Sequence, residues 1–179
     1  MDSIKNIITG GIITLVVGGA AFTFSQEAVI DNFAKDTGLT QEQAEQYVNN
    51  IPEDELVSFD ELGENYISAG EDTLEYLNSI DCDNYEYEWE SATLPCATGK
   101  AQLRKTGNTE KLVGQGFIAL SSDSATKEDM SAVIGYLDQL NSDYSLEISR
   151  VIYGKSAIDE FKKTNSYNKS LLKAALESD

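Results

Sequence analysis

The feature that most constrains this chain is an uncharged segment of 18 residues, from Ile7 to Phe24. As an α-helix, the segment would be about 27 Å long, close to the hydrocarbon thickness of a lipid bilayer. A helix on the surface of a soluble core normally carries a polar stripe, and this segment has none. We therefore expect one N-terminal transmembrane helix within residues 1–25, followed by a separate domain over residues 26–179.

A cleaved signal peptide is the alternative interpretation of the same segment. Lys5 supplies a basic start, and Thr23 and Ser25 place small side chains before a cleavage site at Gln26. Against cleavage, the apolar run is longer than the roughly 7–15 residues of a signal peptide, and no Ala-x-Ala site is present. We favour a retained signal-anchor, so that residues 1–25 form a membrane anchor of a single-pass protein.

One face of the expected membrane helix carries small side chains. Gly11, Thr14, Gly18 and Ala21 fall on one helical stripe, and small residues let a second helix approach closely within lipid. This stripe predicts a contact with the helix of another membrane protein. The alternative is a span without a partner, because glycine and alanine are common in transmembrane helices in general.

Helix signals recur through residues 26–179. Thr40 and Gln43 have the spacing of a capping box, and Gly38 suits the end of a helix over residues 26–37. Pro52 predicts the start of another helix, and apolar residues spaced by three and four continue to Leu77. We expect a mostly α-helical bundle.

Two segments give mixed signals. Residues 100–121 read either as a helix weakened by glycines or as a hairpin that turns at Gly107 and Asn108, and we prefer the helix. Residues 144–153 fit both alternating and helical spacing, so their structure stays open. Thr126 or Ser124 is expected to cap a helix that continues to about residue 140.

The two cysteines, Cys82 and Cys96, enclose the least helical part of the sequence. We expect a disulfide between them, which would stabilise the fold by roughly 3 kcal/mol through closure of a loop of about 15 residues. Disulfides persist in oxidising compartments, so this bond agrees with an extracytoplasmic domain. The N-terminus would then lie in the cytoplasm, and the domain in the periplasm, in a lumen or outside the cell. Two separate reduced thiols are the alternative.

Inside this loop, acidic and aromatic residues alternate. In an extended chain the aromatic side chains would share one face and the acidic ones the other. The aromatic face is a candidate partner surface, because Trp and Tyr are favoured anchors of protein interfaces. The alternative is that the rings pack on the helices while the carboxylates face water. The residues concerned are Tyr85, Tyr87 and Trp89, with Glu86, Glu88 and Glu90 on the other face.

The charge excludes some functions. Residues 26–99 carry 19 acidic side chains and one basic side chain, Lys35, and so hold the whole net charge of −18. Binding to nucleic acid is not expected, because it requires clustered Lys and Arg. The chain has no histidine, which removes the commonest general base and the commonest metal ligand. The segment that starts Asp81-Cys82-Asp83 lacks the later ligands of an EF-hand, so only weak Ca²⁺ binding by scattered carboxylates is considered.

From these observations we expect a non-catalytic accessory or interaction subunit of a membrane-protein complex, anchored by a single span and without a cofactor. The alternative is an exported acidic domain that binds a divalent cation or a basic ligand. An enzyme is not expected, since neither a phosphate-binding loop nor a nucleophile elbow nor a metal-ligand motif is present.

Overall fold

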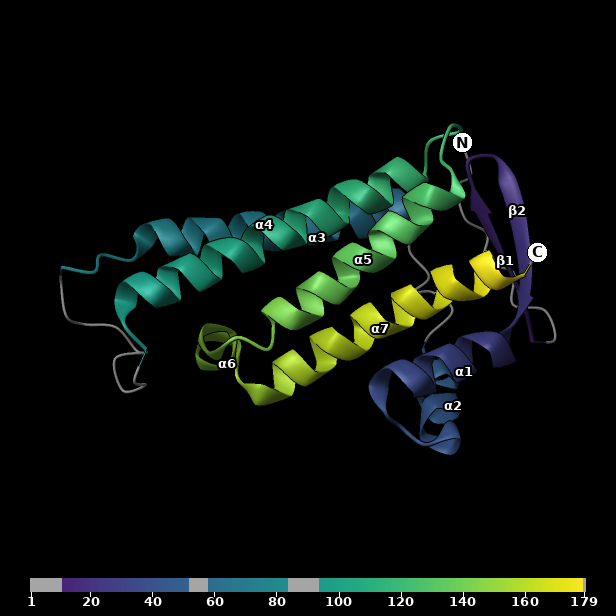
Figure 1. Ribbon diagram of the computed structural model, residues 1–179, viewed down its shortest axis with the longest axis horizontal. Coiled ribbons are helices and arrows are strands. Elements are labelled where there is room, and N and C mark those ends of the chain that lie inside the picture. The colour runs from purple at the N-terminus through teal and green to yellow at the C-terminus, as the bar shows by residue number, and fades with distance from the viewer. Residues whose placement is uncertain (1–10, 52–57, 84–93, 179) are drawn as a thin grey trace.

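The computed structural model describes residues 11–51, 58–83 and 94–178. These residues form seven helices and one β-hairpin (Figure 1). The strands are β1 (Ile12–Val17) and β2 (Ala20–Ser25), and the helices are α1 (Gln26–Thr37), α2 (Gln41–Asn49), α3 (Phe59–Ser79), α4 (Cys96–Leu120), α5 (Lys127–Asp143), α6 (Glu147–Tyr153) and α7 (Lys155–Glu177). The expectation of a mostly helical bundle is confirmed.

The prediction of an N-terminal transmembrane helix is wrong for residues 11–25, which form the hairpin β1–β2. The strands pair antiparallel with Val17 opposite Ala20, so Gly18 and Gly19 are the two turn residues. Both turn glycines have positive φ angles, 59° and 72°, which suits the type I′ turns that match the twist of a hairpin. Among the helices of the described residues, none is both long enough and apolar enough to cross a membrane.

The hairpin buries one face in the main core, which explains why its sequence resembles a membrane segment. Ile13, Leu15 and Val17 of β1, with Phe22 and Phe24 of β2, pack with buried side chains of α1, α4, α5 and α7. The outward face is only weakly polar, since it carries Ile12, Thr14, Val16, Ala21 and Thr23. The segment therefore shows no charge, although it is amphipathic with a period of two.

Capping residues define the next two helices as the sequence predicts. Ser25 ends β2 and caps α1, because its hydroxyl accepts a hydrogen bond from the Ala28 amide. Gly38 ends α1 in the left-handed conformation, and Thr40 and Gln43 form a capping box at the start of α2. The helix start predicted at Pro52 lies outside the described residues.

Helices α3 and α4 lie antiparallel along the long axis of the molecule and touch through their backbones (Figure 1). A Cβ atom added at Gly63 would lie 2.6 Å from the carbonyl oxygen of Gly114, and one at Gly70 would lie 2.6 Å from that of Gly107. We call these two pairs, Gly63–Gly114 and Gly70–Gly107, the glycine seam. Residues 100–121 are thus a helix, as preferred from the sequence, and two of the glycines that weaken its propensity make the close packing possible.

Helices α5, α6 and α7 complete the bundle next to α3 and α4. Thr126 caps α5 with a reciprocal hydrogen bond to Asp129, which selects Thr126 over Ser124 as the cap. The open segment 144–153 contains the short helix α6, and Gly154, with a φ angle of 78°, leads directly into α7. α7 packs against both α1 and α5 (Figure 1).

The predicted disulfide between Cys82 and Cys96 is present, with an S–S length of 2.04 Å. It links a residue three positions beyond the end of α3 to the first residue of α4, next to a small second hydrophobic cluster. That cluster contains Leu77, Ile80, Leu94, Leu103 and Ile148. The disulfide therefore ties together the two helices of the glycine seam at one end of the bundle.

Candidate functional site

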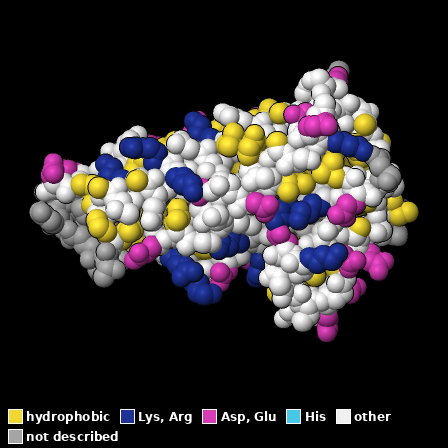
Figure 2. Space-filling model, in the orientation of Figure 1, with side chains coloured by type: hydrophobic (Ala, Val, Ile, Leu, Met, Phe, Trp, Pro, Cys, Tyr) yellow, Lys and Arg dark blue, Asp and Glu magenta, His cyan; other side chains and the backbone are white. Residues whose placement is uncertain are grey.

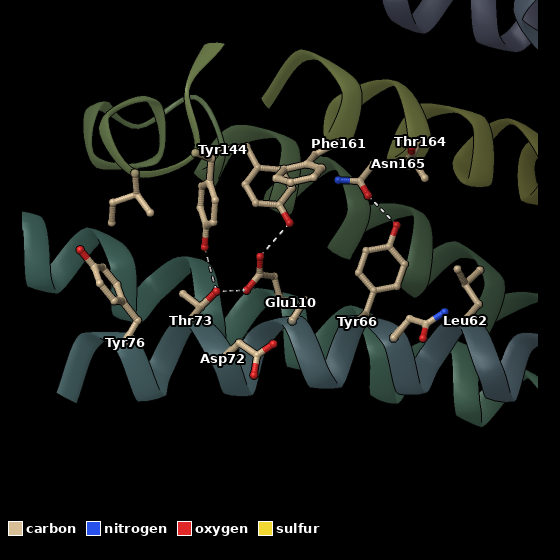
Figure 3. A pocket seen from close by; sticks show the side chains of 14 residues that line it. Leu62, Tyr66, Asp72, Thr73, Tyr76, Glu110, Tyr144, Phe161, Thr164 and Asn165 are labelled. Carbon is tan, nitrogen blue, oxygen red and sulfur yellow. Dashed lines mark hydrogen bonds between the residues drawn. The ribbon is translucent and has the colours of Figure 1, made fainter. Parts of the chain in front are cut away.

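A cavity of about 520 Å³ lies between α3 on one side and α6 and α7 on the other (Figure 3). One face of α3 supplies half of its lining, because the residues concerned recur at every turn of the helix, singly or as adjacent pairs. These residues are Leu62, Asn65, Tyr66, Ala69, Asp72, Thr73 and Tyr76. The other helices contribute Glu110 from α4, Tyr144 from the end of α5, Ile152 and Tyr153 from α6, and Phe161, Thr164 and Asn165 from α7.

Aromatic rings form much of the cavity wall. The centroid of Tyr144 lies 5.5 Å from that of Phe161 and 6.5 Å from that of Tyr153, and the Tyr153 and Phe161 rings meet edge to face at 5.8 Å. Tyr66 stacks on Phe117 of the core at 5.7 Å. Tyr76 and Phe161 remain 42% and 39% exposed, so they lie where the cavity meets solvent.

Glu110 lies at the inner end of this aromatic wall, with only 2% of its surface exposed. The phenol of Tyr144 donates a hydrogen bond to Oε1 at 2.7 Å, and the hydroxyl of Thr73 donates to Oε2 at 2.8 Å (Figure 3). Since Thr73 uses its one proton on Glu110, the phenol of Tyr153 donates to Thr73, at 2.9 Å. Two hydroxyl groups thus donate directly to one carboxyl group, and the third, of Tyr153, is connected to it through Thr73.

Burial raises the pKa of Glu110 above its ordinary value of 4.5. The hydrogen bonds from Tyr144 and Thr73 oppose the shift, whereas the negative charges of Asp143 and Asp72 add to it. Burial also raises the pKa of Tyr144 and of Tyr153, so both phenols remain neutral donors. A buried carboxyl with a raised pKa in a cavity is a recognised mark of functional sites.

No Lys or Arg within the described parts of the chain forms an ion pair with Glu110. Its neighbour Asp143, which is fully buried, differs in this respect. Asp143 accepts hydrogen bonds from Thr109 at 2.6 Å and Gln139 at 2.9 Å, and pairs with Lys105 at 2.8 Å. Because Asp143 is fixed by these groups, the following residue, Tyr144, is held in place against Glu110.

A chain of amides holds the opposite wall. The Tyr66 phenol donates to the Asn165 carbonyl oxygen at 2.5 Å, and the Asn165 amide donates to Asn141 at 2.8 Å. The amide of Asn168 also donates to Tyr66, at 3.3 Å. These bonds join α3, α5 and α7 beneath the cavity, so its shape is set by buried polar contacts as well as by packing.

A second hollow, of about 570 Å³, lies between α1, α5 and α7 and is lined mainly by polar side chains. Its charges balance, with three aspartates and three lysines, and both signs are intermixed on this face of the molecule (Figure 2). Lys169, 3% exposed, pairs with both Asp36 and Asp138. Since the buried charge of this hollow, Lys169, is already paired with two aspartates, the first cavity is the better candidate site.

None of the described residues that the sequence predicts as functional lines this cavity. Gly11, Thr14, Gly18 and Ala21 belong to the hairpin, where β1 and β2 place them on no helical stripe. The predicted partner surface, with Tyr85, Tyr87, Trp89, Glu86, Glu88 and Glu90, lies outside the described residues. As for Ca²⁺, no group of three or more acidic or cysteine side chains suited to a metal ion occurs among the described residues.

Sequence reasoning missed Glu110 and the cavity. Glu110 lies between Thr109 and Lys111 in a polar stretch, and nothing local distinguishes it from the other acidic residues. One usable signal was present on α3, where Tyr66, Thr73 and Tyr76 share a helical face with Leu62 and Ala69. A face that mixes aromatic and hydroxyl groups is typical of a ligand-binding wall as well as of a core.

Comparison with known proteins gives no match to a protein-family model, to a curated protein or to a solved structure.

Proposed function

We propose that this domain binds a small organic ammonium ion in the cavity, with the charged group against Glu110 and the apolar part against the aromatic wall. The proposal is a non-catalytic binding function, and it develops the basic ligand expected as an alternative from the sequence. The disulfide supports a setting in an oxidising compartment, beyond the cytosol.

The observation that carries the proposal is the state of Glu110. A carboxylate buried without a cation is costly, because hydrogen bonds to neutral hydroxyls replace its lost hydration only in part. Each carboxylate has about four acceptor positions, and Tyr144 and Thr73 occupy two. A ligand ammonium group would use the remaining positions and supply the missing positive charge.

The walls of the cavity support the same ligand chemistry. Rings of Tyr and Phe attract a cation held over their faces, by about 0.5–2 kcal/mol depending on desolvation. Tyr66, Tyr144, Tyr153 and Phe161 all border the cavity, whose volume is typical of small-molecule sites. A cationic ligand with a short apolar body therefore fits both the charge and the lining.

The test compares pentylamine with its uncharged analogue pentanol, by calorimetric or NMR titration of the whole protein. We expect pentylamine to bind more tightly, and Glu110→Gln to weaken pentylamine by about tenfold or more while leaving pentanol nearly unchanged. Glu71→Gln is the matched control, because Glu71 is an exposed carboxylate of α3 outside the cavity, paired with Lys111 at 3.4 Å. Equal binding of pentylamine by the wild type and Glu110→Gln would contradict the proposal.

The interaction subunit expected from the sequence remains a hypothesis. Its aromatic and acidic surface lies outside the described residues, and its membrane helix is replaced by the hairpin over residues 12–25. No described feature favours it over the binding of a small ligand.

A further inference from the structure

A second acidic side chain, Asp72, borders the same cavity but differs from Glu110 in exposure and in partners. Asp72 lies on α3 directly before Thr73, the residue that hydrogen-bonds Glu110. It is exposed, and within the described residues it takes part in neither a hydrogen bond nor an ion pair. Its neighbours on α3 are already engaged, since Glu71 pairs with Lys111 and Thr73 binds Glu110.

Exposed aromatic side chains line the same cavity as Asp72. Tyr76 lies one helical turn further along α3, so the two side chains share a face of the helix. Tyr76 is 42% exposed, and Phe161 of α7, which lines the same cavity, is 39% exposed. The solvent side of the cavity thus repeats the chemistry of its inner end, a carboxylate beside aromatic rings.

We infer that the ligand is a linear diamine, with one ammonium group at Glu110 inside the cavity and the second at Asp72 at its mouth. The inference rests on the proposed function and adds its ligand class. The apolar chain of such a ligand would lie within the cavity, whose lining includes the apolar side chains of Ala69 and Ile152. The negative charge of Asp72 adds to the raised pKa of Glu110, which is consistent with two carboxylates close enough to act on one ligand.

The two ammonium groups of the ligand are expected to bind with different strengths. Glu110 is shielded from solvent, so its contact with an ammonium group is strong and insensitive to salt. Asp72 is exposed, and an exposed ion pair contributes little binding energy, so its contact with the second ammonium group changes the affinity by about fivefold. Added salt reduces this contribution. The second site therefore selects diamines over monoamines without dominating the binding.

The experiment measures the affinities of cadaverine and of pentylamine, which have the same chain length but two and one ammonium groups. Either end of cadaverine can enter the cavity, so a twofold advantage is purely statistical, and only an excess counts. We expect cadaverine to bind about tenfold more tightly than pentylamine to the wild type, and only about twofold more tightly to Asp72→Asn.

Two controls separate the inference from the proposed function. Glu71→Gln removes the same charge from α3 outside the cavity, and is expected to keep the cadaverine advantage. Asp72→Asn is expected to weaken pentylamine far less than Glu110→Gln does, because Asp72 is exposed. If pentylamine binds through Glu110 but cadaverine shows no excess, or if Asp72→Asn preserves the excess, the diamine inference is overturned while the proposed function stands. If pentylamine binding does not depend on Glu110, the proposed function itself fails.

Discussion

The two sides of α3 meet their neighbours in opposite ways. Toward α4, Gly63 and Gly70 bring two backbones into direct contact, and no space remains for even one methyl group. Toward α6 and α7, Tyr66 and Thr73 border a cavity of about 520 Å³. Both sets of residues are spaced by seven positions, so one helix combines a tightly packed side and an open side. The difference indicates that the cavity belongs to one side of α3, whereas the other side is packed backbone against backbone.

The disulfide links α3 and α4 at one end of their tightly packed contact, and breaking this bond is expected to cause the largest change in the free energy of unfolding. The double variant Cys82→Ser with Cys96→Ser should lose about 3 kcal/mol of unfolding free energy, because the unfolded chain gains the entropy of an open loop. Urea unfolding of the wild type and the variant measures the difference. A loss below about 1 kcal/mol would show that the seam holds α3 and α4 without the bond.

A methyl group added within the seam tests the close contact itself. In Gly63→Ala the new Cβ would lie 2.6 Å from both the Gly114 carbonyl oxygen and a side-chain carbon of Ile118, so the helices must move apart. We expect a loss of about 2 kcal/mol in urea unfolding, despite a gain of about 1 kcal/mol in helix propensity.

The matched control is Gly135→Ala in α5. A Cβ there meets nothing within 4 Å, so only the propensity gain of about 0.5–1 kcal/mol applies and the variant should be more stable than the wild type. Equal effects of the two substitutions would refute the assignment of Gly63 to a backbone contact.

On the open side, Glu110 is expected to reduce stability in favour of binding. Its pKa is raised in the folded state, so the stability that protonated Glu110 contributes to the fold is present below about pH 4.5. This stability is lost as the pH rises through the pKa of the folded state. Glu110→Gln avoids that loss, and should therefore be more stable than the wild type at pH 7 but not at pH 4, by a difference smaller than the seam effect. Thermal unfolding at the two pH values measures it. A variant less stable than the wild type at neutral pH would contradict this interpretation.

Filling the cavity is the smallest expected change in stability. Ala69→Leu places a larger side chain into open space on the cavity wall, so the free energy of unfolding should stay within about 0.5 kcal/mol of the wild type. Pentylamine affinity should nevertheless fall by about tenfold or more, because the leucine occupies the volume of the ligand. The control is Ala101→Leu, at an exposed position of α4 outside the cavity. Unchanged pentylamine binding by Ala69→Leu would place the ligand elsewhere.

Features set by local chemistry were predictable from the sequence. The capping box at Thr40 and Gln43, the left-handed Gly38 and the cap at Thr126 depend on neighbouring residues only, and all are present. The pairing of Cys82 with Cys96 was predictable because the sequence has just two cysteines, on either side of a stretch with few helix signals. For residues 100–121, the choice of a helix was right, but its reason became visible only when Gly107 and Gly114 met α3.

The hairpin and the cavity are the features that were not predicted from the sequence. The absence of charge in residues 11–25 predicts a membrane helix. The informative signals for a hairpin are the Gly18-Gly19 pair between two β-branched or aromatic runs and the alternation of their buried residues. The cavity brings together residues of α3, α4, α6 and α7 with Tyr144, which follows α5. Glu110 becomes exceptional only through Tyr144 and Thr73, which lie 34 and 37 positions away in the sequence. Such a site depends on tertiary packing, which periodicity along one segment does not encode.

The most direct test of the central claim is the pKa of the Glu110 carboxyl, measured by carbon NMR titration with and without saturating pentylamine. We expect a value above 4.5 in the free protein, and a lower value in the complex, because a bound ammonium ion favours the ionised carboxylate. Affinity for pentylamine should fall correspondingly as the pH drops below the pKa of the free protein. A Glu110 pKa that stays the same or rises when pentylamine binds would contradict the assignment of this carboxyl as the ammonium site.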